Sequence, residues 1–534
     1  MLELNKKNYS HNLDFVRDLR TVFSKHSIAP EAKSKLIVTY KDLIKKGIIK
    51  ENKKLEQLLT KRAVRTLSGV SVITVLTRPY HCPGRCIYCP LEPGMPKSYL
   101  SNEPAAQRAK RNFFDPIRQV NMRIQALQNN GHQVDKIEII VLGETWSAYP
   151  KKYQTSFIRD LFYAANVFRS ASSGQVNKKN KRKARSLKAE QKINEKARYK
   201  IIGLTLETRP DHITTQEIKR LRMLGATRMQ IGVQHTDNKI LDLIQRDHPI
   251  EQSIKATRML KEAGFKVDHH YMPDLPGSTP AKDLKMFEYV YNSPDLQPDQ
   301  IKIYPCVVNE YAPLYQWYKK GKYKPYSPKE LLDLLLKIKK ITPPWIRINR
   351  LIRDIPEESI IAGNKITNLR QYLQAELKKR GQSCQCLRCR EVRGDTKDVD
   401  KAVLVKREFA ASQGQEIFLS FESKDHKKVY AFLRLRFNKN PEKNIFAELK
   451  NASLVRELHV YGQMIPTYDE KSDEEISQTQ HLGLGKRLMA EAEKITHSHG
   501  LNKVAVISGI GVRNYYRKLG YRLEGTYMTK TLTK

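Results

Sequence analysis

The stretch GVSVITVLTRPYHCPGRCIYC (69–89) decides how the rest of the chain is interpreted. Its first half is rich in Val, Ile and Thr and is bounded by Arg-Pro, a pattern typical of a β-strand. Its second half places Cys82, Cys86 and Cys89 in one short loop. Because thiolates are metal ligands, three of them so close together predict a metal centre at the carboxyl end of this strand.

Two kinds of metal centre fit three thiolates. A tetrahedral zinc ion needs a fourth ligand, which the adjacent His81 could supply. A 4Fe-4S cluster needs only three protein thiolates when one iron stays open for another ligand. The spacing CxxxCxxC, with an aromatic residue before the last cysteine, resembles the signature of the radical S-adenosylmethionine superfamily. The resemblance implies that Cys82, Cys86 and Cys89 hold a 4Fe-4S cluster whose open iron binds S-adenosylmethionine, which is then reduced to a 5′-deoxyadenosyl radical.

Further β-rich runs follow this loop, most of them with helical segments between them. They are KIEIIVLGE (136–144), YKIIGLTLETRP (199–210), RMQIGVQH (228–235), FKVDHHYMPDLPG (265–277) and DQIKIYPCVV (299–308). Six strands alternating with helices predict an α/β fold, a parallel sheet or partial (β/α)6 barrel, over residues 66–375. In such barrels chemistry collects at the carboxyl ends of the strands. A Gly-Glu there is also typical of an ordinary turn, but the resemblance places Glu144 near the amino group of S-adenosylmethionine.

The pattern changes after about residue 396, where strands surround one long helix. The runs are EIFLSFE (416–422), KVYAFLRLRF (428–437), SLVRELHVYG (453–462), HLGLGKRLMAEAEKITHSHG (481–500), KVAVISG (503–509) and NYYRKLGYRLEGTYMTKTL (514–532). Gly483 and Gly485 let the backbone approach a ligand, and free N–H groups at the start of the helix suit a pyrophosphate. This order resembles the Gcn5-related N-acetyltransferase fold, so residues 396–534 are expected to form an α+β domain that binds acetyl-CoA.

The balance of charge indicates a polyanionic partner. The 534 residues include 97 Lys and Arg but 56 Asp and Glu, a formal net charge of +41. Nucleic acid is the usual partner of such a surface. No run of about 18 apolar residues could span a membrane, and the start MLELNKK lacks the apolar core of a secretory signal. We therefore expect a cytoplasmic protein without a membrane partner.

Two segments concentrate this charge. Residues 1–65 are rich in lysine and have helical apolar spacing, so we expect a basic helical region that binds nucleic acid. A second basic segment, 171–200, interrupts the alternation of strands and helices. Within it, residues 177–200 hold 11 Lys and Arg against 2 Glu. This insertion is either a solvated, partly helical segment or a flexible phosphate-binding arm.

The remaining cysteines form a second cluster and one isolated residue. Residues from about 320 to 395 are expected to be helical and basic, and they end in a linker, 376–395, that contains Cys384, Cys386 and Cys389. In a reducing cytosol three close thiolates suggest a structural zinc ion, completed by a distant His or Cys. Cys306, in the apolar run IKIYPCVV, is expected to be a buried strand residue.

Several specific segments accompany the Cys loop in a fixed order. They are VDKIEIIVLGET (134–145), LETRPD (206–211), MPDLPG (272–277), VRELHVYG (455–462), QHLGLG (480–485) and RNYYRKLGY (513–521). Together they resemble the catalytic subunit family of Elongator, the tRNA wobble-uridine carboxymethylation enzyme, in its bacterial and archaeal form. The basic region 1–65 would then bind tRNA.

The resemblance implies a radical reaction on tRNA. The deoxyadenosyl radical takes a hydrogen from the methyl group of acetyl-CoA, the acetyl radical attacks C5 of the wobble uridine in the anticodon loop, and thioester hydrolysis leaves 5-carboxymethyluridine. Lys136 and Tyr516 take catalytic roles, and one tyrosine of the pair Tyr515 and Tyr516 is expected in the core. The residues implied to bind acetyl-CoA are Lys136, Glu457, Leu458, His459, Val460, Leu484, Gly485, Lys486 and Tyr516. The sequence identifies no electron donor and fits a monomer or a homodimer.

Two other functions are weighed against this one. A protein lysine acetyltransferase with a structural Fe-S domain needs an acidic groove for its substrate, which a net charge of +41 disfavours. A catalytically silent tRNA-binding scaffold would have lost motif residues, yet the three loop thiols and the glycine loop are intact. The tRNA-modifying enzyme is therefore the leading hypothesis.

Overall fold

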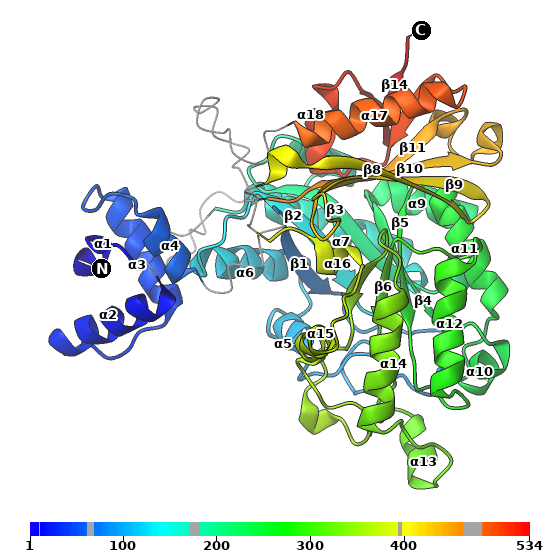
Figure 1. Ribbon diagram of the computed structural model, residues 1–534, viewed down its shortest axis with the longest axis horizontal. Helices are drawn as coiled ribbons and strands as arrows, with labels where there is room; N and C mark the ends of the chain where they lie inside the picture. The colour runs from blue at the N-terminus through cyan, green and yellow to red at the C-terminus, as the bar shows by residue number, and fades with distance from the viewer. Residues whose placement is uncertain (10, 61–68, 170–181, 394–397, 463–482, 534) are drawn as a thin grey trace.

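The structure, a computed structural model, describes residues 1–9, 11–60, 69–169, 182–393, 398–462 and 483–533. These residues form a small helical part, a parallel sheet with its helices, and a second, mixed sheet (Figure 1). The expected boundary at 65–66, the insertion residues 171–181, the end of the Cys-rich linker and the loop residues 480–482 lie outside the described residues. Over the described ranges, no helix is both long and apolar enough to cross a bilayer.

The first sheet is parallel throughout, with its strands in sequence order. Its strands are β1 (Ser71–Leu76), β2 (Lys136–Leu142), β3 (Lys200–Thr208), β4 (Arg228–Gln234), β5 (Lys266–Tyr271), β6 (Gln300–Ile303) and β7 (Arg347–Arg350). The six predicted strands are β1 to β6. The seventh, β7, lies in a segment that was expected to be helical, and it pairs with β6. The α/β half-barrel is thus confirmed and is one strand longer than predicted.

Helices cover the outer face of this sheet, while the inner face lines a cavity. Along β2, Ile137, Ile139 and Val141 are buried toward the helices, whereas Glu138 and Ile140 face the cavity. This alternation follows from the two-residue period of a strand. The helices of this part are α5 (Pro104–Arg111), α6 (Pro116–Asn129), α7 (Lys151–Val167), α8 (Leu187–Asn194), α9 (Thr215–Leu224), α10 (Asn238–Leu243), α11 (Ile250–Glu262), α12 (Pro280–Asn292), α13 (Leu314–Lys319), α14 (Pro328–Ile341), α15 (Leu369–Lys379) and α16 (Leu387–Arg390).

The second sheet is antiparallel except where β11 and β12 run parallel. Its strand order is β13-β14-β12-β11-β10-β9-β8, with β8 (Val403–Ala411), β9 (Gly414–Glu422), β10 (Val429–Asn438), β11 (Ser453–Val460), β12 (Lys503–Val506), β13 (Arg522–Glu524) and β14 (Tyr527–Thr531). The long helix α17 (Leu484–Ser498) packs against β10 and β11, and the short helix α18 (Arg513–Arg517) follows β12. The α+β architecture expected for this region is what the structure has.

The two sheets are joined by a shared core and by buried ion pairs. Leu454, Ile507 and Tyr527 of the second sheet belong to the same buried cluster as the first sheet. Arg456 of β11 donates to Asp299, just before β6, and to Glu416 of β9 at 2.9 Å. Because a buried charge without a partner is costly, these pairs bind the two sheets to each other.

The N-terminal helices form a body of their own beside the first sheet (Figure 1). They are α1 (Leu2–Asn5), α2 (Asn12–Lys25), α3 (Lys33–Lys45) and α4 (Lys53–Leu59), packed around a core that includes Phe15, Ile37 and Tyr40. This body meets the rest of the chain at Gly131, after α6, where an added Cβ would lie 2.4 Å from Ile37 Cδ1. Its binding of tRNA stays a prediction.

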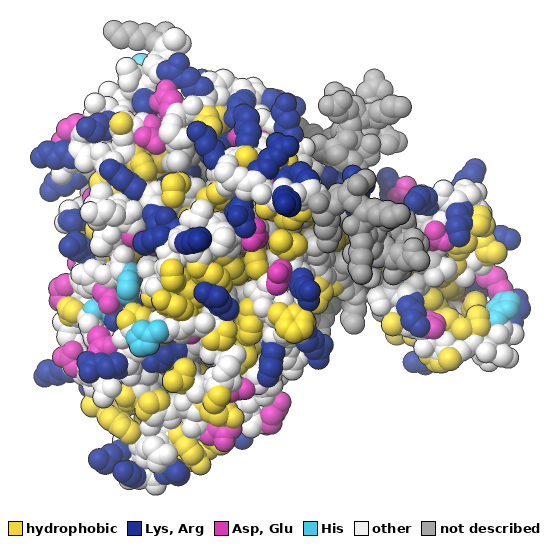
Figure 2. All heavy atoms as spheres, turned by 180° about the vertical axis from the view of Figure 1, so that it is seen from behind, with side chains coloured by type: hydrophobic (Ala, Val, Ile, Leu, Met, Phe, Trp, Pro, Cys, Tyr) yellow, Lys and Arg dark blue, Asp and Glu magenta, His cyan; other side chains and the backbone are white. Residues whose placement is uncertain are grey.

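The described part of the basic insertion, residues 182–200, packs against the rest of the structure. Helix α8 packs on α7, and Leu187, Glu190 and Asn194 are buried. Its cations point outward: the exposed residues are Lys183, Arg185, Lys188, Lys192, Lys196 and Arg198. Figure 2 shows Lys and Arg side chains gathered in the upper part of the rear face, where the second sheet and its helices lie. Residues 182–200 are therefore neither a free arm nor fully solvated.

Candidate active site

One cavity of about 1340 Å³ occupies the inner face of the first sheet. Its wall includes the Cys loop, the inner residues of β1 to β7, the Cys-rich linker and Tyr461, the residue after β11. The carboxyl ends of parallel strands meet at one edge of a sheet, which is why loops so far apart in sequence converge here. The cavity thus reaches from the predicted radical site to the predicted coenzyme strand.

The Cys loop lines this cavity with Cys82, Cys86 and Cys89. The sulfur of Cys82 lies 3.6 Å from Thr145 Oγ1, and the buried Cys86 sulfur accepts a hydrogen bond from Arg246 Nη1 at 3.4 Å. Hydrogen bonding with Cys89 and the charge of Arg246 lower the pKa of Cys86 to about 4, although burial alone would raise it. A thiol held as thiolate beside an open cavity fits a ligand of an Fe-S cluster.

Glu144 follows β2 on the same cavity wall. Its Oε1 accepts hydrogen bonds from the backbone N–H groups of Tyr80 (3.1 Å) and Lys97 (3.0 Å). Its Oε2 is buried and has no hydrogen-bond partner within the described residues, and burial raises the pKa of this carboxyl. A Cβ at Gly143 would lie 2.0 Å from Thr77 Oγ1, so glycine is required at this turn. An unpaired buried acceptor of this kind fits an ammonium donor from a ligand.

Basic side chains dominate the rest of the cavity wall. They are Lys97, Arg108, Arg123, Arg209, Arg228, Arg246, Lys302, Arg347, Arg350, Arg353, Lys365, Arg370, Arg388 and Arg393. Sequence analysis did not single out these residues. The sequence feature that could have identified this basic wall is the three-residue spacing of Arg347, Arg350 and Arg353, which places three arginines in one short segment. Such a wall suits phosphate groups.

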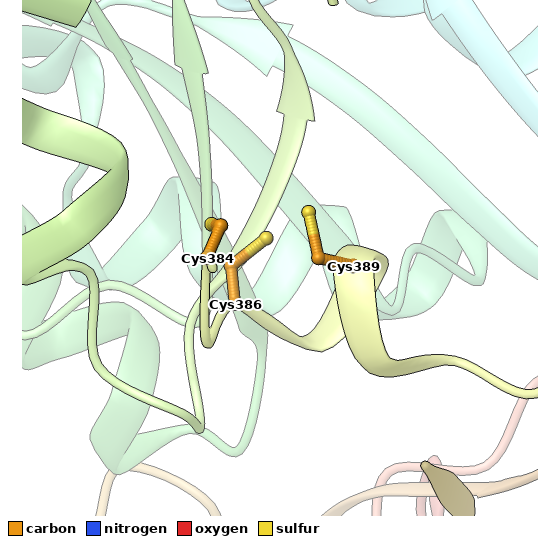
Figure 3. A group of neighbouring side chains, drawn as sticks. All are labelled: Cys384, Cys386 and Cys389. Atoms are coloured by element: carbon orange, nitrogen blue, oxygen red, sulfur yellow. The ribbon is translucent and has the colours of Figure 1, made fainter. Parts of the chain in front are cut away.

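The second cysteine cluster is compact (Figure 3). The sulfurs of Cys384, Cys386 and Cys389 all lie within 4.8 Å of one another. With Zn–S bonds of about 2.3 Å, tetrahedral thiolates around one ion lie roughly 3.8 Å apart, so the group fits zinc. Lys339 Nζ lies 3.7 Å from the Cys389 sulfur and Gln374 Nε2 lies 3.8 Å from it. The described residues contain no His, Asp, Glu or further Cys that completes this group, so the expected distant ligand is not found among them.

The predicted coenzyme strand is the end of β11. Glu457 accepts from Lys266 Nζ (3.2 Å) and Arg434 Nε (3.0 Å), and these cations hold its pKa at about 2 despite burial. His459 stacks on Phe432 with 5.7 Å between ring centroids. Burial lowers the pKa of His459 to about 4, and its Nε2 is buried without a hydrogen-bond partner in the described part of the chain. His459 is therefore neutral at pH 7 and has one ring nitrogen to offer.

The start of α17 meets both β11 and α18. Leu484 and Gly485 are buried, whereas Lys486 is exposed. A Cβ at Gly485 would lie 2.8 Å from Tyr515 Oη and 3.5 Å from Val460 Cγ2, so Gly485 sits directly between these residues. Leu458, two residues before Val460, packs against the core of the second sheet.

The tyrosine pair divides as expected, with one ring in the core. Tyr516 is only 6% exposed, and its ring centroid lies 6.1 Å from that of Tyr521, whereas Tyr515 is 37% exposed. The core residue is thus Tyr516, to which the family pattern gave the coenzyme role. By position Tyr515 is the tyrosine that faces the start of α17, and the role of Tyr516 stays a prediction.

Lys136 begins β2, where it pairs in register with Lys200 of β3. It is half-buried, and burial lowers its pKa. Glu138, two residues further along the same face of the strand, forms an ion pair with Arg228 at 2.8 Å. Burial opposes the ionised form of Glu138, Arg228 and Lys266 favour it and lower its pKa overall, and the charge of Glu457 on β11 opposes it. The inner face of β2 and the coenzyme strand are therefore neighbours.

Comparison with known proteins places the whole chain in one group. Residues 77–290 match the model of the radical SAM superfamily, and residues 298–379 match that of the Radical_SAM C-terminal domain. The chain is 42% identical to the tRNA uridine(34) acetyltransferase of Methanocaldococcus infernus, over 92% of this chain and 91% of that protein. It is 38% identical to Elongator complex protein 3 of Homo sapiens, over 89% and 86%.

A solved structure agrees with these relatives. The archaeal Elp3 of Methanocaldococcus infernus, lacking residues 1–46, is 39% identical and covers 87% of this chain and 99% of its own, with a TM-score of 0.72. Identity above 30% over most of the chain settles the relationship. The chain belongs to the radical SAM family that contains the tRNA uridine(34) acetyltransferases and Elongator complex protein 3.

Proposed function

We propose that the protein carboxymethylates C5 of the wobble uridine in tRNA, with acetyl-CoA as the carbon source and a 5′-deoxyadenosyl radical as the oxidant of its methyl group. One observation carries this proposal: a single cavity is lined both by the Cys loop and by Tyr461, the residue that follows the coenzyme strand. The names of the relatives, which refer to uridine 34 of tRNA, support the substrate.

The Cys loop and Glu144 serve the radical half of the reaction. Cys82, Cys86 and Cys89 would hold a 4Fe-4S cluster, which supplies the electron that cleaves S-adenosylmethionine to methionine and the radical. Arg246 stabilises the Cys86 thiolate through its 3.4 Å hydrogen bond. Glu144 would accept a hydrogen bond from the cofactor's ammonium group with Oε2, while backbone N–H groups hold Oε1 in place.

The second sheet serves the coenzyme half. The backbone N–H groups at the start of α17, a helix of 15 residues, would bind the pyrophosphate of acetyl-CoA, and Gly485 leaves room for the close approach of Tyr515 and Val460 to this turn. Lys486, exposed beside it, and Lys136 add positive charge for the phosphates. His459, with its unpaired Nε2, would act as the neutral imidazole that activates the water for thioester hydrolysis.

The basic cavity wall favours RNA over a protein substrate. Arg347, Arg350 and Arg353 line the cavity on and after β7, and each forms an ion pair, with Glu391, Asp354 and Glu103 respectively. Arg350 is the most exposed of the three and would bind a tRNA phosphate. A lysine-rich peptide, the substrate of the alternative protein acetyltransferase, would be repelled by the same residues. The second cysteine cluster, in the linker between the parts of the chain that form the two sheets, would hold a structural zinc ion.

The test is an anaerobic reaction with tRNA, acetyl-CoA, S-adenosylmethionine and a reductant, followed by mass analysis of the nucleosides. The wild type should form 5-carboxymethyluridine, and Cys86→Ala should form none. Cys306→Ala is the matched control, because Cys306 is another buried cysteine outside both clusters, and it should keep its activity. Absence of product from the wild type, or equal product from Cys86→Ala, would defeat the proposal.

A further inference from the structure

We propose that Glu195 is a positioning residue for the coenzyme site, although it belongs to the part of the chain that contains the radical site. It fixes helix α18, and through α18 it holds Tyr515 against the start of α17. This inference rests on the proposed function, because acetyl-CoA is proposed to bind where α17 begins.

Glu195 follows α8 and is 2% exposed. Its Oε1 accepts a hydrogen bond from Arg513 Nη1 at 3.1 Å, and its Oε2 accepts one from Arg517 Nη1 at 2.8 Å. Its backbone oxygen accepts a third from Asn514 Nδ2 at 3.2 Å. All three donors lie on α18, so one residue of the insertion holds the whole helix.

Helix α18 needs such support because it is short. It has five residues and no side-chain cap at its start, and isolated helices of this length are unstable. The turn before it is also docked on the first sheet: a Cβ at Gly509 would lie 1.9 Å from Ile202 O, and one at Gly511 would lie 2.7 Å from Lys200 Cβ. The backbone of residues 509–511 therefore lies directly on β3.

Anchoring one face of α18 fixes the direction of the other. Arg513 and Arg517 are four residues apart and share a face of the helix, which is the face that Glu195 holds. Tyr515 lies halfway between them in sequence and so points to a different side. Its hydroxyl lies 2.8 Å from the place where a Cβ of Gly485 would be, at the first turn of α17. Rotation of α18 would move this hydroxyl away from the coenzyme site.

The contact is charge-assisted: the Glu195 carboxylate is buried, whereas the Arg517 side chain is 33% exposed. Burial opposes the ionised form of Glu195, but hydrogen bonds from Arg517 and Arg513 lower its pKa overall. Glu190, on α8, is an internal comparison: it is also buried, and its carboxylate is held by Arg182 Nη2 at 2.6 Å and by Asn166 Nδ2 of α7 at 2.9 Å rather than by residues of α18. The Glu195 carboxylate thus bonds to α18, whereas the Glu190 carboxylate does not take part in holding that helix.

The test compares Glu195→Gln with the matched control Glu190→Gln in the full-length protein. Acetyl-CoA affinity is measured by calorimetry, 5′-deoxyadenosine formation reports the radical site, and thermal unfolding reports stability. Glu195→Gln should weaken acetyl-CoA binding about tenfold, equivalent to about 1.4 kcal/mol, and leave 5′-deoxyadenosine formation unchanged when acetyl-CoA is saturating. Glu190→Gln should lower the unfolding temperature but keep wild-type acetyl-CoA affinity. Glu195→Asp should recover part of the lost affinity.

A second variant separates positioning from general damage. In a Tyr515→Phe background, Glu195→Gln should weaken binding by less than its tenfold effect in the wild type, because both changes act through the same hydroxyl. Equal acetyl-CoA affinity in Glu195→Gln and wild type, equal weakening by Glu190→Gln, or full additivity with Tyr515→Phe would each overturn the positioning role. A wild-type protein that does not bind acetyl-CoA would overturn the proposed function and the positioning role together.

Discussion

Arg456→Met is predicted to loosen the junction between the two sheets. Arg456 is completely buried and donates hydrogen bonds to Asp299, to Glu416 and to the backbone oxygen of Phe265 at 2.6 Å. Methionine fills a similar volume but leaves two buried carboxylates with fewer cations. Removing one partner of a buried charge pair lowers the free energy of unfolding by about 3–5 kcal/mol. Both sheets are destabilised, because Asp299 precedes β6 of the first sheet and Glu416 lies on β9 of the second.

The assay is urea unfolding followed by tryptophan fluorescence. Trp345 is a suitable probe because it lies before β7 and stacks on Phe409 of the second sheet at 4.4 Å. Arg407→Met is the control, since Arg407 bonds to Ser420 and Glu422 of β9, and Glu422 keeps its ion pair with Arg390 at 3.1 Å. It should cost about 1 kcal/mol. If Arg456→Met shifts the unfolding midpoint no more than Arg407→Met does, the buried pairs do not hold the sheets together.

Three further predictions concern the separate parts of the site. Glu144→Gln keeps the acceptor for both backbone N–H groups but replaces the unpaired oxygen with a donor, so S-adenosylmethionine affinity measured by calorimetry should fall about tenfold; unchanged affinity would contradict the role of Oε2. Replacing the second cysteine cluster with serines should remove bound zinc, measured by atomic absorption, and lower the unfolding temperature; normal stability and activity would show that the cluster is dispensable. Binding of tRNA should weaken steeply with salt, and Arg350→Ala should reduce the slope of log Kd against log salt by about 1; an unchanged slope would exclude a phosphate contact.

Most of the first sheet could be predicted because its strands are short runs rich in Ile, Val and Leu, with the apolar residues alternating or in series, bounded by Gly, Pro and polar residues. The strand β7 was missed because its four residues, Arg-Ile-Asn-Arg, contain one apolar side chain, Ile348, and the charged ones face the cavity. Local composition predicts β7 poorly, because hydrogen bonds with β6 stabilise this strand although its residues have low β-propensity.

The parts of the candidate site that could be predicted are those in which residues lie close together in the sequence. The short intervals between Cys384, Cys386 and Cys389 bring their sulfurs together almost regardless of the fold. The choice between Tyr515 and Tyr516 could not be made from sequence, because adjacent helical residues differ in direction by about 100° and only the packing of α18 decides which is buried. In the insertion, the many cations concealed a buried helical face, which became visible only through contacts with α7 and α18.

The central claim is that the radical and acetyl-CoA react within one cavity. Its most direct test is a reaction with acetyl-CoA carrying three deuterium atoms on the methyl group, together with unlabelled S-adenosylmethionine and tRNA. We expect 5′-deoxyadenosine recovered from the reaction to gain one deuterium, because the radical takes its hydrogen from that methyl group. Recovery of 5′-deoxyadenosine without deuterium, while 5-carboxymethyluridine is still formed, would contradict it.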